Sequence, residues 1–93
     1  MKNKRNIVFS KKFTRKLKKT DISKVMLISM AVSKFENGED ETLRIHKLKG
    51  KYKNYWSFDA DYDLRVIYTL NENGCVIIHN IEDFGTHKEL YGR

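Results

Sequence analysis

Three short apolar runs separated by turn signals fill the second half of the chain, and they constrain the fold more than any other feature. The runs cover residues 55–60, 63–70 and 75–81, and apolar and polar residues alternate in the first two. Side chains two positions apart in an extended strand share a face, so this alternation predicts strands with one buried face. Asp61-Tyr62 and the Asn-Glu-Asn-Gly sequence at 71–74 are typical of hairpin turns. The pattern therefore predicts a small antiparallel sheet.

The first half of the chain has helical periodicity after one short strand. Residues 6–9 favour a strand, and Ser10 is a good N-cap for a helix through about residue 19. Thr20 or Asp21 can cap a second helix, which has a broad apolar stripe and stops before an Asn-Gly pair. The expected element order is β-α-α-β-β-β. This order predicts an α+β fold in which two N-terminal helices pack on one face of the sheet.

Length and charge limit the kind of protein and the partners. The chain has 93 residues, enough for a single domain over residues 1–93. Its net charge of +7 favours a polyanionic partner such as nucleic acid or an acidic protein. We expect a cytoplasmic protein with no membrane partner, because no apolar segment approaches the length of a membrane span. The one cysteine, Cys75, lies in an apolar run and is expected to be buried and structural.

Polar residues on the second face of the predicted sheet are candidates for chemistry. If the apolar side chains face the helices, Asp59, Asp63 and Arg65 face away from the core. On pattern alone, a solvent-exposed face with cross-strand ion pairs is the more common explanation.

The three histidines do not have the spacing of a metal site, so we expect no metal and no cofactor. His46 and His87 lie near lysines, which would lower a histidine pKa and suit a base at neutral pH. The alternative is an exposed histidine without a role, and His79 is better explained as structural. Among the aromatic residues, Tyr91 near the C-terminal end is the strongest candidate to stack on an unpaired base.

Four motifs in order give the second half of the chain a family resemblance. They are His46-Lys-Leu-Lys-Gly50, Tyr55-Trp56, Asp63-Leu-Arg65-Val-Ile-Tyr68 and Gly85-Thr-His87-Lys-Glu-Leu-Tyr91. This ordered set resembles the RelE/YafQ family of type II toxins, with the YafQ branch the closer match. The resemblance implies a RelE-like fold and a ribosome-dependent endoribonuclease that cleaves messenger RNA without a metal.

The resemblance also implies roles for particular residues. The activity of the YafQ branch maps onto His46, Asp63, His87 and Tyr91. Arg65 matches a RelE-like arginine that binds phosphate, and Asp59 stands where the YafQ branch has another histidine. Lysines alternate along residues 47–53, which we call the basic segment. Its contacts to the substrate would come from Lys47, Lys49 and Lys51. The base would be His87 or Asp63, and the acid His46 or His87.

The expected partners are a cognate antitoxin, messenger RNA and the A site of the small ribosomal subunit. An acidic antitoxin segment would complement the basic toxin. One alternative is a ParE-like toxin that binds DNA gyrase and has no ribonuclease site, and another is a non-catalytic domain that binds RNA or antitoxin. The Gly-Thr-His ending and the His46 motif favour the ribonuclease over the gyrase-binding toxin.

Overall fold

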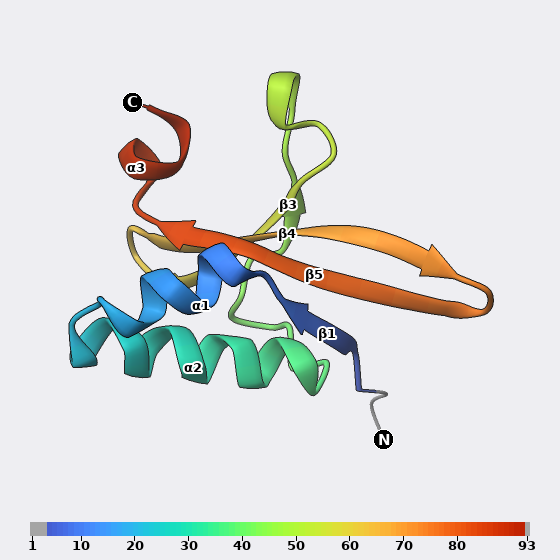
Figure 1. Cartoon of the computed structure of the whole chain (residues 1–93), viewed down its shortest axis with the longest axis horizontal. Helices are drawn as coiled ribbons and strands as arrows, with labels where there is room; N and C mark the ends of the chain where they lie inside the picture. Colours follow the sequence, from blue (N-terminus) through green and yellow to red (C-terminus); the bar gives the residue numbers. More distant parts are fainter. Residues whose placement is uncertain (1–3, 93) are drawn as a thin grey trace.

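A computed structural model describes residues 4–92 of the chain, and its centre is a five-stranded sheet with the strand order β1-β5-β4-β3-β2 (Figure 1). The strands are β1 (Asn6–Phe9), β2 (His46–Lys47), β3 (Trp56–Asp61), β4 (Leu64–Asn73) and β5 (Val76–Gly85). The helices are α1 (Lys11–Lys18), α2 (Ile22–Glu36), the 3₁₀ turn η1 (Gly50–Tyr52) and the short C-terminal α3 (His87–Tyr91). Helices α1 and α2 lie on one side of the sheet, whereas η1 and α3 lie on the other (Figure 1).

The predicted α+β fold and its two-helix layer are confirmed, but the sheet is mixed. Strand β1 pairs with β5 in parallel, from Asn6 opposite Ile78 to Phe9 opposite Ile81. The prediction of a purely antiparallel sheet was therefore wrong at this edge. The reason is that β1 is joined to its neighbour only through the rest of the chain, and its four residues carry no signal of strand direction. The expectation of one domain over residues 1–93 stays a prediction, and residues 1–3 and 93 lie outside the described part.

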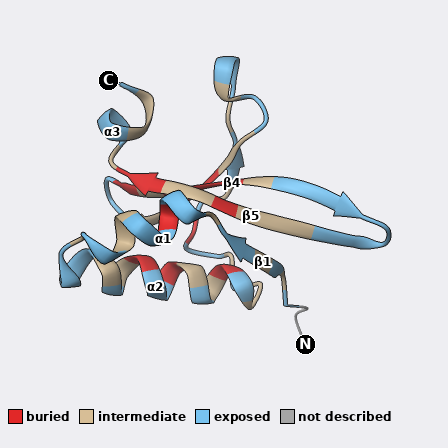
Figure 2. Ribbon diagram, in the orientation of Figure 1, coloured by how far each residue is buried: buried red, intermediate tan, exposed pale blue. Residues whose placement is uncertain are grey.

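The core lies between the two long helices and one face of the sheet (Figure 2). Phe35 of α2 is fully buried, and its ring stacks on Phe58 with the centroids 4.5 Å apart. Val66 and Tyr68 of β4 share this face, as the alternation predicted. Ser10 caps α1 as expected, since its hydroxyl accepts a hydrogen bond from the Phe13 amide.

The β4–β5 hairpin is longer than predicted and extends beyond the helical layer (Figure 1). Asn73 pairs with Val76, so the turn consists of Gly74 and Cys75, and Gly74 has a φ of 66°. The prediction that Cys75 is buried was wrong, because Cys75 lies at the exposed tip of this hairpin. An apolar neighbourhood in the sequence does not reveal that a hairpin leaves the core.

The second face of the sheet is partly covered rather than open. Ser57 and Ile67, which lie opposite each other on β3 and β4, are both buried. The Tyr52 hydroxyl of η1 donates a hydrogen bond to the Leu90 carbonyl of α3 over a distance of 3.1 Å. The η1 loop and α3 are thus joined above this face, and they define where its polar residues can be reached.

Candidate functional site

The candidate site lies on the second face of the sheet, where the β3–β4 turn meets the start of α3. Asp59 and Arg65 are directly opposite each other on β3 and β4. The Arg65 Nη1 donates a hydrogen bond to Asp63 Oδ1 over 2.8 Å, and the Arg65 Nε lies 3.9 Å from Asp59 Oδ1. The predicted set Asp59, Asp63 and Arg65 is therefore one contiguous cluster, with the guanidinium between two carboxylates.

Asp63 joins this cluster to His87. The backbone N–H of His87 donates a hydrogen bond to Asp63 Oδ1 over 3.0 Å, so one oxygen accepts from both His87 and Arg65. These contacts lower the pKa of Asp63, chiefly through the hydrogen bond from the His87 backbone. Asp63 is consequently ionised at neutral pH and is a weak base.

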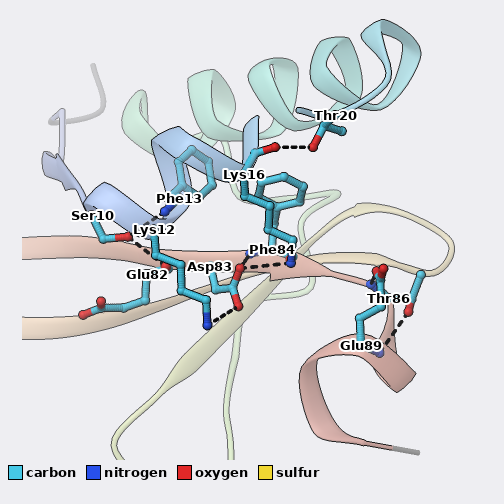
Figure 3. A network of polar contacts seen from close by, with 10 residues as sticks. All are labelled: Ser10, Lys12, Phe13, Lys16, Thr20, Glu82, Asp83, Phe84, Thr86 and Glu89. Atoms are coloured by element: carbon cyan, nitrogen blue, oxygen red, sulfur yellow. Dashed lines mark hydrogen bonds and ion pairs between the residues drawn. The ribbon is translucent and has the colours of Figure 1, made fainter. Parts of the chain in front are cut away.

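His87 is the first residue of α3, and local capping together with a network at the end of β5 fixes the start of this helix. Figure 3 shows the contacts of that network. The Thr86 hydroxyl accepts from the Glu89 amide, and the Glu89 carboxylate accepts from the Thr86 amide, which is a complete capping box. Upstream, Lys16 of α1 donates to Asp83 and to the Phe84 carbonyl (Figure 3). The position of His87 therefore depends on α1 as well as on its own helix.

Tyr91 lies one helical turn after His87, and its ring contacts two aromatic neighbours. Its centroid is 4.7 Å from that of His87 and 5.3 Å from that of Tyr52, in edge-on geometry. Its hydroxyl is buried, and burial raises the pKa of Tyr91. Ser57 lies close enough to influence this pKa in the opposite direction, although the two hydroxyls do not form a well-aligned hydrogen bond. The Tyr91 hydroxyl therefore keeps its proton at neutral pH.

Three polar atoms around this cluster are buried and have no hydrogen-bond partner within the described structure. They are Ser57 Oγ, Asp59 Oδ1 and Tyr91 Oη. Buried polar atoms are satisfied in most native structures, so a group of unsatisfied ones indicates a place where a polar ligand completes the hydrogen bonding. The alternation placed Ser57 on this face, but only its burial marks it as part of the site.

His46 projects from the same face, because it is paired with Ser57 in the β2–β3 register. Its Nδ1 is 2.9 Å from the Arg44 carbonyl. A carbonyl only accepts hydrogen bonds, so Nδ1 carries the proton and Nε2 is the acceptor in the neutral ring. Arg44 itself has a φ of 54°, the left-handed conformation that non-glycine residues rarely adopt.

The basic segment divides between the two faces. Lys47 is paired with Trp56, whose ring stacks on Tyr68 of the core, so Lys47 projects away from the candidate site. Lys49 caps η1 and is exposed, and Lys51 lies within it with Nζ 5.4 Å above the Tyr52 ring. Of the three lysines predicted to contact substrate, Lys49 and Lys51 are therefore the two that the loop places near the α3 side of the sheet.

Residues 4–92 were searched for groups of metal ligands and for membrane-spanning helices, and neither was found. No three His, Cys, Asp or Glu side chains come together there in a group that could hold a metal ion. Within the same residues, no helix has the length and apolar character needed to cross a bilayer.

Comparison with known proteins places the chain in one family. The model of the bacterial type II toxin-antitoxin system toxin YafQ matches residues 5–92. The chain therefore belongs to the YafQ family of bacterial toxins from type II toxin-antitoxin systems. A search of curated protein sequences found no match.

Solved toxin structures share the fold. A YoeB/ParE toxin from Agrobacterium tumefaciens superposes with a TM-score of 0.67 at 19% identity, over 88% of this chain and 98% of that one. YafQ in the Escherichia coli DinJ–YafQ toxin-antitoxin complex gives 0.64 at 22% identity, over 96% and 99%. A chain of the YoeB–YefM complex from Staphylococcus aureus gives 0.62 at 25% identity, over 89% and 97%.

Proposed function

We propose that the chain is an endoribonuclease toxin that cleaves messenger RNA on the ribosome without a metal, and that a cognate antitoxin inhibits it. The observation that carries the proposal is the hydrogen-bonded group of Arg65, Asp63 and His87 beside the unsatisfied atoms of Ser57 and Tyr91. In this reaction the ribose 2′-OH attacks the adjacent phosphate, and the 5′-oxygen leaves. The reaction needs a base, an acid and positive charge for the phosphorane.

The division of roles follows from the electrostatics of the site. Asp63 accepts two hydrogen bonds and has a lowered pKa, which favours His87 over Asp63 as the base. Asp63 then acts as a positioning residue that holds both His87 and Arg65. As an imidazolium, His46 would give its Nε2 proton to the leaving 5′-oxygen and would keep the Nδ1 proton that faces the Arg44 carbonyl. His87 takes up the proton of the 2′-OH in the same reaction, so one proton enters the site and one leaves it.

Charge and hydrogen bonding at the phosphate would come from three elements. Arg65 is already fixed by Asp59 and Asp63, so little side-chain entropy is lost when it binds a phosphate oxygen. The protonated Tyr91 hydroxyl can donate a further hydrogen bond, beside the proposed stacking of its ring on a base. Lys49 and Lys51 would contact the RNA backbone from the η1 loop, whereas the face on which Lys47 lies does not favour such a contact.

The partners follow from charge and from the relatives. The DinJ–YafQ and YoeB–YefM complexes contain toxins of this fold, which supports an antitoxin as the partner here. A chain of net charge +7 would attract an acidic antitoxin segment, and also the RNA of the ribosomal A site in the cytoplasm. Ribosome binding should weaken as salt concentration rises.

The test is primer-extension mapping of 5′-OH ends in a translating reaction, with wild type beside His87→Ala. Loss of a proton-transfer group costs about 10²–10⁴-fold in rate, so His87→Ala should lose cleavage and growth arrest. His87 is exposed and the variant keeps its backbone N–H, so antitoxin binding and the circular dichroism spectrum should not change.

Two outcomes would contradict the proposal. If His87→Ala arrests growth at full strength, the role of His87 is wrong. If wild type leaves messages intact and induces an SOS response, the ParE-like alternative, which binds DNA gyrase, replaces the ribonuclease.

A further inference from the structure

Tyr62 is an exposed aromatic residue beside the candidate site that the proposed mechanism does not use. Its exposed fraction is 94%, the largest of the exposed hydrophobic residues in the described chain. Asp61 pairs with Leu64, so Tyr62 and Asp63 form the two-residue turn between β3 and β4. The sequence pattern placed this turn one residue earlier and gave Tyr62 no role.

The turn that carries Tyr62 is held in place on both sides. Asp63, the next residue, accepts hydrogen bonds from the His87 backbone and from the Arg65 side chain. Leu64, the residue after it, is buried in the core. Consecutive Cα atoms are about 3.8 Å apart, so the Cα of Tyr62 lies at about that distance from the Cα of Asp63. Asp63 in turn contacts Arg65, the proposed phosphate-binding residue, and His87, the proposed general base. The backbone at Tyr62 is therefore held beside the site, and its ring is left uncovered.

We propose that Tyr62 stacks on an unpaired RNA base next to the scissile phosphate. The inference rests on the proposed ribonuclease function and names a further substrate-binding residue for it. Every base has a flat π-face, and a single aromatic stack strengthens binding about 5- to 100-fold by alanine substitution. Tyr91 offers less ring surface, since its ring lies edge-on to Tyr52 and His87 and its hydroxyl is buried.

The charges around Tyr62 favour a base over the other occupants. Asp61 and Asp63 flank Tyr62 in the sequence, and their negative charges disfavour an RNA phosphate or an acidic antitoxin segment beside it. Arg65 attracts the phosphate on the other side of Asp63. The uncharged base is the part of the RNA that can lie over the turn while its phosphate lies at Arg65.

The experiment measures kcat/KM for message cleavage on programmed ribosomes with Tyr62→Phe and Tyr62→Leu. Leucine keeps apolar surface but has no ring, so Tyr62→Leu should lower kcat/KM about 5- to 100-fold, mainly by raising KM. Phenylalanine keeps the ring and should stay within about twofold of wild type. The matched control is Met26→Leu, an exposed apolar position on α2, which should leave kcat/KM unchanged.

Messages with a purine or a pyrimidine beside the cut distinguish the source of the base. If Tyr62→Leu lowers kcat/KM more for the purine message than for the pyrimidine message, the stacked base belongs to messenger RNA, because purines have the larger stacking surface. If Tyr62→Leu lowers kcat/KM equally for both messages, the stacked base belongs to ribosomal RNA.

The proposal is overturned if Tyr62→Leu has the kcat/KM of wild type, or if kcat/KM falls as much in Tyr62→Phe as in Tyr62→Leu. It is also overturned if Tyr62→Leu weakens only antitoxin binding in calorimetry, which would make the turn a protein-docking surface. Absence of cleavage by wild type would instead refute the proposed function itself, so the two failures are distinguishable.

Discussion

Asp63 contacts both Arg65 and His87 in the candidate site, and these contacts favour one of the two roles that its sequence position left open. A carboxylate that accepts from a backbone N–H and a guanidinium is held ionised, so its proton affinity is reduced where a base would need it raised. The sequence made Asp63 a candidate for the site, but it did not predict the hydrogen bond from the His87 amide. That contact joins residues 24 positions apart and depends on how α3 docks.

The lowered pKa of Asp63 gives a prediction for acid pH. Its folded-state pKa lies below the ordinary value of 3.8, so the hydrogen bond to the His87 amide is fully present above that value. The bond weakens as the pH falls through the folded-state pKa. In nitrogen-proton NMR spectra, the His87 amide shift should titrate with a midpoint below 3.8. Asp63→Asn keeps an acceptor oxygen without a titrating proton, and this transition should be absent in it. A midpoint above 3.8 would contradict the assigned contacts.

At the scale of elements, α3 is the part that the sequence described least well. The Gly-Thr-His ending was recognised only as a motif, whereas in the structure it is a capping box on a helix bound through Tyr52 and Asp63. The alternation in β3 and β4 correctly gave the face of each side chain. The pairing of β1 and the exposure of Cys75 were not predictable, because both depend on contacts between segments that local periodicity does not record.

Gly85 gives an element-scale prediction, because it lies where β5 passes into α3. A Cβ at this position would meet the Glu89 Cβ at 3.2 Å and the Glu89 carboxylate at 3.1 Å. Gly85→Ala should therefore push Glu89 out of the capping box and displace His87, and we expect at least about a tenfold loss of cleavage rate. The readout is single-turnover cleavage together with urea unfolding.

The matched control for this change is Gly74→Ala at the hairpin tip. A Cβ there would meet nothing within 4 Å, although the φ of 66° adds strain of about 1 kcal/mol. This variant should lose a little stability and keep the cleavage rate. Equal cleavage by both variants would show that α3 is not held by its close approach to Gly85.

Over the whole molecule, the hydrophobic core and the candidate site lie on opposite faces of one sheet. The helical layer buries Phe35, Phe58 and their neighbours on one face, and the polar cluster lies on the other. The sequence predicted this division because an alternating strand places core and site residues on opposite sides. It did not predict how far the second face is covered, since Tyr52 lies in a loop without periodicity. Core changes and site changes should accordingly be separable in experiment.

His79 allows the stability of the whole fold to be tested as a function of pH. Its ring contacts Phe35 and Tyr68, and its Nδ1 is 3.2 Å from the Asn6 carbonyl of β1. Burial lowers the pKa of His79 below 6.5, and the nearby Arg5 acts in the same direction. The unfolded chain therefore binds a proton that the folded chain resists, so the free energy of unfolding falls as the pH drops below about 6.5 and continues to fall down to the folded-state pKa.

His79→Gln removes this titration and should lose less stability than wild type between pH 7.5 and pH 5.5. Urea unfolding followed by the fluorescence of Trp56, the only tryptophan, measures the difference. The other titrating groups are common to wild type and His79→Gln, so the comparison isolates His79. If wild type and His79→Gln lose the same stability over this range, the partial burial of His79 does not lower its pKa.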